Sequence, residues 1–270
     1  MGVLDGQSAL VTGGGSGIGL ACAAHVARDG AAVVLAGRNE SKLSAAADGL
    51  RAEGASEVHI AVCDVTDEDA VREACAVAAG VGRFTMVVAS AGTGGASPIH
   101  LTPLEEWSTV LATNLTGAFL TIKHAAPHLA RSGGGSIVAV SSIAGPLTHR
   151  YMTSYCVSKA GLEMLVRNAA DELGAVGIRA NAVRPSLVPT DLAVGLTGNP
   201  DIVADYLDQI PVGRLGTVDD IASVVRFLLG PESGWVSGQC ISTDGGHTLR
   251  RGPNLTPLFE AVLGDDAHPH

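Results

Sequence analysis

The amino-acid sequence predicts an α/β fold in which helices cover both faces of a doubly wound parallel sheet of about seven strands. Short apolar runs bounded by glycine or polar residues alternate along the chain with longer segments rich in alanine and leucine. Continuous apolar strands are typical of a parallel sheet that is buried on both faces, and strand–helix alternation joins such strands by right-handed crossovers. A glycine-rich turn between the first expected strand and the first expected helix favours the same fold.

Each expected element follows from its apolar pattern and from the turn residues around it. The expected strands are 8–12, 31–36, 58–63, 84–89, 136–141, 178–183 and 239–243. The expected helices are 18–29, 39–53, 67–80, 103–130, 153–174 and 217–229. Ligands of such folds bind beyond the carboxyl ends of the strands, so we expect the residues that follow these strands to form one site.

One internal stretch and the C-terminus depart from this alternation. Residues 186–213 contain several prolines and glycines among apolar side chains, which predicts a mobile lid over a substrate pocket. The motifs of the expected sheet run from residue 12 to residue 246, so we predict a single domain over residues 1–252. Residues 253–270 form a C-terminal tail that is either loose or packed on a neighbouring subunit.

The composition excludes several classes of function. The 270 residues carry 17 basic and 27 acidic side chains, a formal net charge of −10, and no basic run, which argues against nucleic acid and anionic membranes as partners. No apolar run reaches the roughly 18 residues of a membrane span, and no signal peptide is recognisable, so we expect a cytoplasmic protein. The five cysteines are scattered without the spacing of a disulfide framework or a metal site, so no metal is expected.

The turn from Leu10 to Gly19 has the spacing of a dinucleotide-binding site. It reads Leu-Val-Thr-Gly-Gly-Gly-Ser-Gly-Ile-Gly, follows an apolar run and opens an alanine-rich segment. Gly13 permits a tight turn, Gly17 lets the backbone approach a pyrophosphate, and Gly19 lets the helix pack closely on the strand. The helix N-terminus then supplies free N–H groups and the positive end of the helix dipole.

The end of the second expected strand indicates which cofactor is bound. An acidic residue there would bind the 2′-hydroxyl of the NAD ribose, but the sequence has Gly37-Arg38-Asn39. Arg38 could pair with a 2′-phosphate and stack on adenine, which favours NADP(H). Ser16 in the turn is neutral and adds no second positive charge, so NAD(H) stays an alternative, with Arg38 as an exposed arginine at a strand end.

Ser142, Tyr155 and Lys159 form the most informative group of polar residues. Tyr155 and Lys159 are four residues apart, which places both side chains on one helix face, one turn from each other. A lysine ammonium in that position lowers the pKa of a tyrosine from its usual value of about 10. Ser142 follows the strand-like run 136–141, and its hydroxyl can donate to a substrate oxygen. Together the three residues predict proton transfer at an alcohol or carbonyl oxygen.

These residues together resemble the short-chain dehydrogenase/reductase family, and the resemblance runs over nearly the whole chain. The family's Thr-Gly-x-x-x-Gly-x-Gly turn corresponds to residues 12–19, and its catalytic serine, tyrosine and lysine correspond to Ser142, Tyr155 and Lys159. Further family motifs match Asp64-Val65, Ala89-Ser90-Ala91-Gly92, Asn114, Pro185-Ser186, Val188, Thr190 and Asp244-Gly245-Gly246.

Three positions depart from the family pattern. Ala89-Ser90 replaces two asparagines, Ser186 replaces a glycine, and Ser16 replaces a basic residue that is frequent in NADP-preferring members. These departures bear on cofactor affinity and preference, and they leave the proton-transfer residues unchanged.

The resemblance implies a Rossmann fold and a site with two sets of residues. The implied catalytic residues are Asn114, Ser142, Tyr155 and Lys159. The implied cofactor-binding residues are Gly13, Gly15, Ser16, Gly17, Ile18, Gly19, Arg38, Asp64, Val65, Ala91, Gly92, Asn114, Tyr155, Lys159, Pro185, Val188 and Thr190.

The resemblance also implies reversible hydride transfer between NADP(H) and a carbonyl/alcohol pair. Tyr155 would exchange a proton with the substrate oxygen, and Ser142 would hold that oxygen by a hydrogen bond. Lys159 would lower the pKa of Tyr155 and bind the nicotinamide ribose, while Asn114 would position a water that links Lys159 to solvent.

The sequence leaves the substrate open. The apolar lid, together with Leu147, Met152, Leu187 and Leu192, favours a small molecule with an apolar body. One interpretation is an NADPH-using reductase of an apolar or 3-oxoacyl thioester substrate, similar to the 3-oxoacyl reductases of the family. The other is an NAD-linked hydroxysteroid or secondary-alcohol dehydrogenase. A non-catalytic NAD(P)-binding sensor is a third, and the presence of all four catalytic residues argues against it.

The two longest expected helices bear on the oligomeric state. Segments 103–130 and 153–174 carry apolar residues on more than one face, which suits burial against both the sheet and partner subunits. We therefore predict a homotetramer.

Overall fold

Seven parallel strands form one sheet in the order β3-β2-β1-β4-β5-β6-β7 in the computed structural model, which describes residues 2–250, 252 and 255–267. The strands are β1 (Gln7–Thr12), β2 (Ala32–Gly37), β3 (Val58–Val62), β4 (Arg83–Ala89), β5 (Gly135–Val140), β6 (Ile178–Pro185) and β7 (Cys240–Thr243). The helices are α1 (Gly17–Arg28), α2 (Glu40–Ala52), α3 (Glu68–Gly80), α4 (Leu104–Leu111), α5 (Gly117–Arg131), α6 (Thr153–Leu173), α7 (Val194–Thr197), α8 (Pro200–Gln209), α9 (Val218–Leu229) and α10 (Thr256–Leu263).

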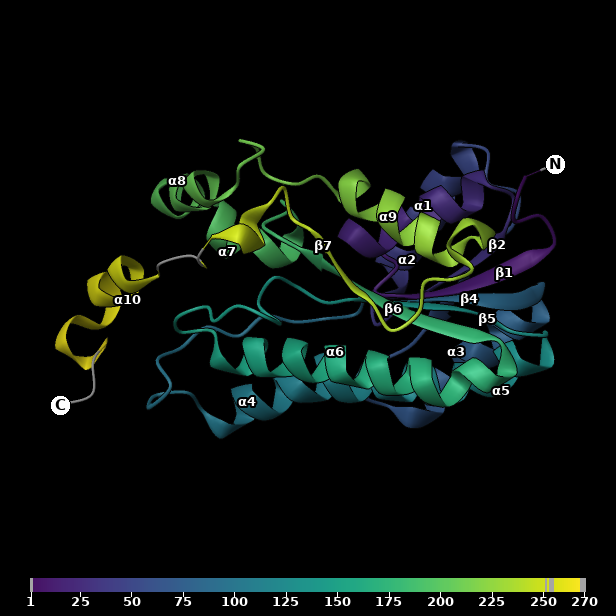
Figure 1. Ribbon diagram of the computed structural model, residues 1–270, viewed down its shortest axis with the longest axis horizontal. Helices are drawn as coiled ribbons and strands as arrows, with labels where there is room; N and C mark the ends of the chain where they lie inside the picture. The colour runs from purple at the N-terminus through teal and green to yellow at the C-terminus, as the bar shows by residue number, and fades with distance from the viewer. Residues whose placement is uncertain (1, 251, 253–254, 268–270) are drawn as a thin grey trace.

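The two faces of the sheet are covered by different helices, which are stacked above and below it in Figure 1. Val11 and Leu35 point from the strands into the layer that contains α1, α2 and α9. Leu10 and Val34, one residue away on the same strands, point into the layer that contains α3, α5 and α6. Because successive strand residues face opposite sides, both faces become apolar and buried. The predicted doubly wound fold is confirmed.

The connection from β3 to β4 creates the crevice in which ligands of this fold bind. The chain runs outward from β1 to β3 and then returns to β4 on the other side of β1. The strand order therefore reverses between β1 and β4, where Thr12 lies beside Ala89. The Thr12 hydroxyl oxygen accepts from the backbone N–H groups of Ser90 (3.2 Å) and Ala91 (3.3 Å), which joins the two strand ends at the base of the crevice.

Side-chain caps explain why several helices begin where they do. Asn39 accepts from the backbone N–H of Lys42 at the start of α2, and Asp67 accepts from two N–H groups at the start of α3. Thr217 and Asp220 form a reciprocal capping box at the start of α9. Such caps satisfy the N–H groups that the first turn leaves unpaired.

The expected helix at 103–130 is interrupted in the structure. A π-helical turn over Ala112–Thr116 separates α4 from α5, and Asn114 lies at its centre. A side chain at Gly117 would place its Cβ 2.6 Å from Val65 Cγ2, so the chain approaches the end of β3 closely at this point. The apolar periodicity did not reveal this turn, because a single extra residue barely changes the pattern.

The predicted lid and the tail both contain regular structure. Within residues 186–213 the chain forms a 3₁₀ turn at Asp191–Ala193, followed by α7 and α8. The mobility of this segment stays a prediction. In the tail, α10 packs on its own chain: Leu255 is buried, and the Phe259 ring lies 4.5 Å from the Tyr151 ring, measured between centroids. Every helix in the described ranges is too short or too polar to cross a membrane.

Candidate active site

The glycine turn after β1 leaves no room for side chains at two of its positions. Gly13 has a φ of 68°, and a Cβ there would lie 3.0 Å from the Ala91 backbone. A Cβ at Gly19 would lie 2.3 Å from the Gly13 carbonyl oxygen. Ser16 caps α1 without a side-chain hydrogen bond, so the first N–H groups of α1 face the crevice. The close-packed turn and the free N–H groups suit a pyrophosphate, and the assignment of these residues to a cofactor stays a prediction.

One cavity of about 290 Å³ extends from this turn along the carboxyl ends of the central strands. Most of the predicted cofactor residues line it: Gly13, Ser16, Gly17, Ile18, Gly19, Ala91, Gly92, Tyr155, Lys159, Pro185, Val188 and Thr190. The predicted residues Gly15, Arg38, Asp64, Val65 and Asn114 lie outside its lining. The fit to a dinucleotide therefore rests on the turn and on the strand ends beyond β4 and β6.

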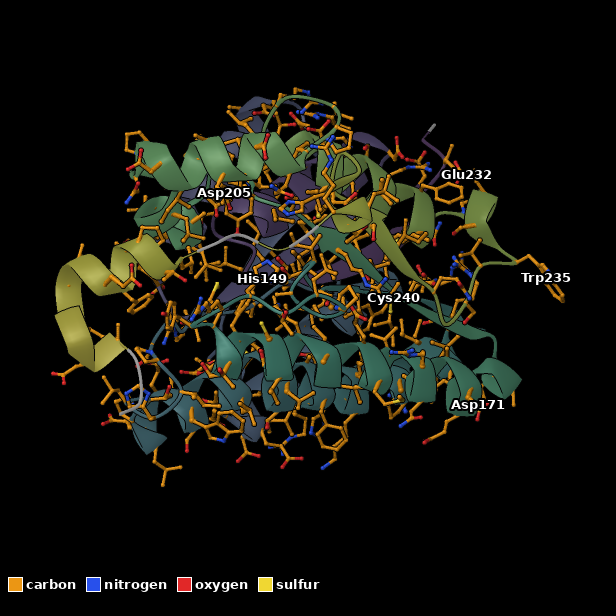
Figure 2. The ribbon with its side chains drawn as sticks, turned by 60° about the vertical axis from the view of Figure 1, so that its left-hand side comes forward. His149, Asp171, Asp205, Glu232, Trp235 and Cys240 are labelled. Atoms are coloured by element: carbon orange, nitrogen blue, oxygen red, sulfur yellow. The ribbon has the colours of Figure 1, made fainter. Side chains whose placement is uncertain are left out.

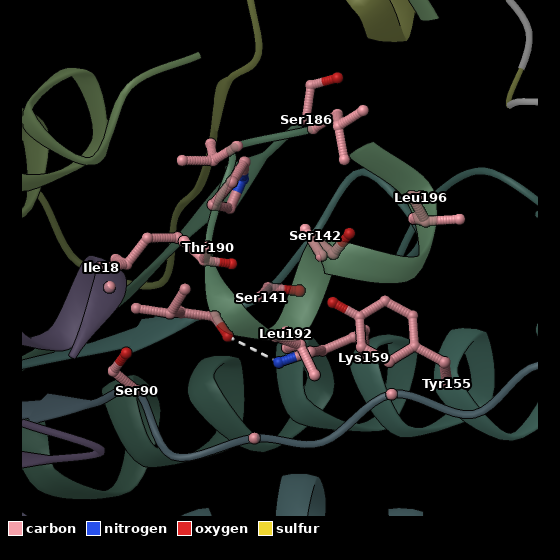
Figure 3. Close-up of a pocket in the computed structure, with 18 of the residues that line it drawn as sticks. Ile18, Ser90, Ser141, Ser142, Tyr155, Lys159, Ser186, Thr190, Leu192 and Leu196 are labelled. Carbon is pink, nitrogen blue, oxygen red and sulfur yellow. Dashed lines mark hydrogen bonds between the residues drawn. The ribbon is translucent and has the colours of Figure 1, made fainter. Parts of the chain in front are cut away.

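The structure brings Ser142, Tyr155 and Lys159 together in this cavity, as Figure 3 shows. Lys159 is buried on α6, and its Nζ donates to the Val140 carbonyl oxygen at 2.8 Å. The same Nζ lies 5.6 Å from the centroid of the Tyr155 ring. Ser142 follows β5, and its hydroxyl oxygen accepts from the Ala144 N–H at 3.1 Å, which orients the side chain. The three residues come from one strand end and one helix face.

The charges around this group differ in part from what the residue spacing suggests. Burial raises the pKa of Tyr155, and hydrogen bonding with the Ser142 hydroxyl opposes that rise. We expected the Lys159 ammonium to lower the pKa of Tyr155, but burial outweighs any such effect in this structure. Burial also lowers the pKa of Lys159 to about 8, and the Glu163 carboxylate opposes that change. Lys159 is therefore mostly protonated at neutral pH and loses its proton in mildly alkaline solution.

Asn114 braces the site from the π-helical turn. Its side-chain oxygen accepts from the Thr93 N–H at 2.7 Å, and its amide donates to the Thr93 carbonyl at 2.9 Å and to the Ser158 hydroxyl at 3.0 Å. These bonds use both N–H donors of the side chain and tie the loop after β4 to α6. The predicted role of Asn114 in positioning a water stays a prediction.

The substrate end of the cavity is mostly apolar. Ile143 and Met152 come from the loop between β5 and α6, and Leu187, Leu192 and Leu196 come from the loop and turn beyond β6. Met152, Leu187 and Leu192 were predicted from the sequence, whereas Leu147 lies outside the lining.

His149 is a polar residue of this wall that sequence reasoning missed. It lines the cavity, is buried, and approaches the Leu147 carbonyl through its Nδ1 at 3.2 Å. Burial lowers the pKa of His149 to about 4, so the imidazole is neutral at physiological pH. The sequence offers no signal for it, because an isolated histidine in a loop belongs to no motif.

The loop after β6 follows a path that Ser186 helps to set. The Ser186 hydroxyl and Nδ1 of the buried His247 lie 2.8 Å apart, which ties this loop to the turn after β7. Further along, the Thr190 methyl would lie 3.3 Å from a Cβ at Gly17, so the segment crosses close to the glycine turn. The serine that replaces the family's glycine thus has a bonding partner here.

The adenosine end contains a lysine that sequence reasoning also missed. Arg38 is exposed beyond β2, and its charge contributes to a lowered pKa of Asp64, whose main cause is the Thr66 N–H. Lys42, in the first turn of α2, forms an ion pair of 3.0 Å with Asp191 of the predicted lid. Asp191 lines the cavity, so the pair lies at its mouth. A second basic residue was considered only within the glycine turn, and Lys42 lies outside that turn.

These features define an oxidoreductase site, because a dinucleotide cradle meets a serine, a tyrosine and a lysine in one cavity. The chain belongs to the short-chain dehydrogenase/reductase family. A family model described as "Enoyl-(Acyl carrier protein) reductase" matches residues 13–248. Relatives of this chain are named as dehydrogenases that act on alcohol groups, so the protein is an enzyme of this kind.

Three relatives illustrate the range of these names. Cis-4-hydroxycyclohexanecarboxylate dehydrogenase of Sinomonas cyclohexanicum is 38% identical and covers 89% of this chain and 96% of its own. Galactitol 2-dehydrogenase (L-tagatose-forming) of Cereibacter sphaeroides is 34% identical, with coverages of 91% and 96%. 7alpha-Hydroxysteroid dehydrogenase of Escherichia coli K12 is 34% identical, with coverages of 90% and 94%.

Solved structures agree with the fold and with a nicotinamide cofactor. A short-chain dehydrogenase/reductase from Mycobacterium ulcerans has a TM-score of 0.95, 40% identity and 98% coverage of both chains. A 7 alpha-hydroxysteroid dehydrogenase complexed with NADH and 7-oxo glycochenodeoxycholic acid has a TM-score of 0.86, 34% identity and coverages of 90% and 94%. A gluconate 5-dehydrogenase from Burkholderia cenocepacia with NADP and tartrate has a TM-score of 0.87, 32% identity and coverages of 92% and 97%.

Proposed function

We propose that the protein interconverts an apolar ketone and the corresponding secondary alcohol with NADP(H) as its cofactor. The observation that carries this proposal is the single cavity in which Ser142, Tyr155 and Lys159 lie between the glycine turn and an apolar wall. A dinucleotide on the turn and a substrate on the wall would meet at these three residues.

The chain's own residues would handle the proton and the orientation of the substrate. A bound nicotinamide supplies or accepts the hydride. In reduction, Tyr155 gives its proton to the substrate oxygen while the Ser142 hydroxyl holds that oxygen by a hydrogen bond. Lys159, when protonated, favours the tyrosinate that remains. The apolar wall excludes water from the reacting carbon.

The lining of the cavity favours a neutral substrate. Among its described lining residues, Lys159 and Asp191 are the charged side chains, and His149 is neutral at physiological pH. Apart from Lys159, the described lining offers no cation for the carboxylate or phosphate of a substrate, so a cyclic or otherwise compact apolar alcohol suits the site best. The name of the hydroxysteroid relative supports a cyclic apolar alcohol, and the name of the hydroxycyclohexanecarboxylate relative supports a ring alcohol that carries a carboxylate in addition.

A second candidate is reduction of a 3-oxoacyl thioester, which the acyl-carrier description of the matching family model favours. A panel of substituted cyclohexanones, oxosteroids and 3-oxoacyl-CoA thioesters, assayed with NADPH, separates the two. We expect turnover of the cyclic ketones with a higher kcat/KM than the thioesters. Turnover of the thioesters alone would contradict the proposal and establish the second candidate.

The preference for NADP(H) is proposed from two positive charges at the adenosine end. Arg38 directly follows β2, and Lys42 lies four residues later, in the first turn of α2. The Lys42 side chain reaches Asp191 at the mouth of the cavity. Either cation can pair with a 2′-phosphate. Asp191 holds Lys42 in an exposed ion pair, which is worth little and is readily exchanged for a phosphate.

Fluorescence titration with NADPH and NADH tests this preference. Arg38→Gln should weaken NADPH binding and leave NADH binding unchanged. Lys42→Gln should weaken NADPH binding by about two- to fivefold, as expected for an exposed charge pair, and Asp191→Asn should strengthen it. Tighter binding of NADH than of NADPH by the unmodified protein would contradict the NADP(H) proposal. Equal losses of NADPH and NADH affinity in the variants would indicate that these side chains bind the pyrophosphate, which both cofactors share.

A homotetramer is proposed from exposed apolar side chains on two different faces. Phe119 on α5 and Met164 on α6 are 46% and 53% exposed. On another face, Trp235 before β7 projects fully into solvent, as Figure 2 shows. Exposed apolar side chains on two faces suit the two kinds of interface in a tetramer with dihedral symmetry. A monomer in light scattering at micromolar concentration would contradict this.

A further inference from the structure

A buried ion pair lies next to the catalytic helix face and has no part in the mechanism described so far. Glu163 follows Lys159 by four residues and Tyr155 by eight, so the three side chains lie along one face of α6. The Glu163 side chain is 3% exposed, and it accepts from Arg184 Nε at 2.7 Å and from Arg184 Nη2 at 2.6 Å. A carboxylate buried this deeply is costly unless it is paired in this way.

The Glu163 carboxylate also contacts the loop that carries Ser142. The Ser141 hydroxyl donates to Glu163 Oε1 at 3.0 Å. A Cβ at Gly145 would lie 2.3 Å from the same oxygen, so the loop folds directly onto the carboxylate. Arg184 immediately precedes Pro185 at the end of β6. One carboxylate thus joins the catalytic loop, the catalytic helix and the strand that leads to the predicted nicotinamide contacts.

The pair is also placed to act on the titrating groups of the site. Burial lowers the pKa of Lys159, and Glu163 is the charged group that opposes this change. Arg184 in turn interacts mainly with Glu163, and more weakly with Cys240 on β7 and with Asp244 directly after it. The other titratable groups around the pair and the tyrosine are Cys156 and Arg167 on α6, Tyr206 on α8, Cys240 on β7 (labelled in Figure 2) and Asp244 beyond it.

We propose that Glu163 and Arg184 are positioning residues that set the proton affinity of Tyr155 and Lys159 and hold Ser142 in register with them. The proposal rests on the proton-transfer chemistry assigned to this site and adds the device that tunes it. The Glu163 carboxylate favours the protonated form of Lys159 and so opposes the effect of burial. The Arg184 guanidinium partly cancels the negative charge and so limits the rise in the pKa values of Lys159 and Tyr155.

This role predicts opposite effects for the two halves of the pair. A negative charge raises, and a positive charge lowers, the pKa of every neighbouring acid or base. Glu163→Gln removes the negative charge and leaves Arg184 unbalanced, so both Lys159 and Tyr155 should titrate at lower pH. Arg184→Gln leaves the carboxylate unbalanced, so both should titrate at higher pH. A purely structural role predicts damage of the same kind in both variants.

The direct test is an NMR titration of the protein labelled with ¹³C in its lysines. The chain contains only three lysines, Lys42, Lys123 and Lys159, so Lys159→Met assigns the signal of interest. We expect the Lys159 midpoint to fall by roughly half a pH unit or more in Glu163→Gln and to rise by a similar amount in Arg184→Gln.

Three controls complete the design. Arg184→Lys keeps the positive charge and should keep the midpoint near that of the unmodified protein, and so should the double variant Glu163→Gln/Arg184→Gln. Arg226→Gln removes the same charge from a partly buried ion pair on α9 and should leave Lys159 unchanged. If Glu163→Gln alone does not fold, the rise in Arg184→Gln and its cancellation in the double variant decide the question. Shifts in the same direction, or no shift in either single variant, would overturn the proposal.

The pH dependence of turnover provides a second measurement with any substrate that the enzyme accepts. We expect the activity profile to move to lower pH in Glu163→Gln and to higher pH in Arg184→Gln. The NMR titration needs neither substrate nor cofactor, so a failure of the proposed substrate class or cofactor preference leaves it intact. A profile that keeps its midpoint while kcat falls in both variants would reduce the pair to a structural role.

Discussion

The cofactor half of the cleft is made largely of backbone, whereas the substrate half is made of side chains from distant segments. In the cofactor half, Gly13 and Gly19 bring the chain so close to itself that a Cβ would collide with backbone atoms. In the substrate half, one cluster joins the loop after β5, the segment after β6, α8 and the tail. Its buried members are Ile143, Tyr151, Met152, Leu187, Ile202, Tyr206 and Leu255.

This difference explains why one half is recognisable by motif and the other is not. A backbone cradle for a phosphate requires glycines at set intervals, because no other residue fits. An apolar wall only needs side chains of suitable volume, which many sequences provide. Relatives with names as different as a galactitol and a hydroxysteroid dehydrogenase match this chain over the same length.

Removing the Tyr155 hydroxyl should separate chemistry from binding in both halves. Tyr155→Phe should lower kcat by on the order of 10³-fold, because the proton donor to the substrate oxygen is lost. NADPH affinity, measured by fluorescence, should stay within twofold of the unmodified protein's, since the ring remains in place. Full activity in this variant would remove Tyr155 from the mechanism.

Two glycines of the cofactor half allow a matched comparison. Gly19→Ala places a Cβ 2.3 Å from the Gly13 carbonyl oxygen, so the turn must shift and NADPH affinity should fall on the order of 100-fold. Gly15→Ala meets Leu43 Cδ2 at 3.4 Å, Lys42 Cβ at 3.7 Å and Leu43 N at 3.8 Å, which are ordinary van der Waals contacts, and should be tolerated. Calorimetric titration of both variants with NADPH checks this. Equal losses of NADPH affinity in the two variants would show that the close contact at Gly19 is not what the cofactor requires.

A buried histidine makes the substrate half sensitive to acid. The pKa of His149 is about 4 in the folded protein because of burial, below the roughly 6.5 of an unfolded chain. The unfolded state therefore binds more protons between these values, and stability is lost as pH falls through them. Between pH 7 and pH 5, the free energy of unfolding should fall in the unmodified protein. This fall should be about 2 kcal/mol larger than in the His149→Gln variant, which lacks the titrating imidazole.

Urea denaturation at several pH values measures this difference. His59→Gln, a substitution of a more exposed histidine on β3, serves as the control and should retain the acid sensitivity of the unmodified protein. An unchanged pH dependence in His149→Gln would show that the folded protein accommodates the charged imidazole.

The tail offers the smallest effect and tests whether it belongs to the substrate wall. Phe259→Ala removes the ring that packs on Tyr151 and should destabilise the wall by about 1 kcal/mol, raising KM for the substrate several-fold. NADPH affinity should change little, because among the described residues the glycine turn contributes nothing to the apolar cluster that contains Tyr151 and Phe259. Val262→Ala, at a 71% exposed position on the same helix, should change neither value. A loss of NADPH affinity in Phe259→Ala would show that the substrate half and the cofactor half are energetically coupled.

Sequence patterns located most of the fold and the centre of the site. The strands lie within two residues of their expected positions, and the four-residue spacing of Tyr155 and Lys159 correctly placed both on one helix face of the cavity. Such features depend on local periodicity, which every helix or strand must obey. The π-helical turn at Asn114 was missed because one extra residue in a helical turn barely changes the apolar pattern, and because Asn114 bonds to Thr93 and Ser158, which are remote in sequence.

The sequence by itself determined the order of the strands along the chain, the glycine turn and the face of α6 that carries Tyr155 and Lys159, because each depends on residues close together in the chain. Only the tertiary structure decided the Glu163–Arg184 pair, the Lys42–Asp191 pair and the burial of His149. Glu163 meets Arg184 across 21 residues and Lys42 meets Asp191 across 149. Contacts of that range, and the pKa shifts that follow from burial, arise when packing brings remote segments together and removes water from between them.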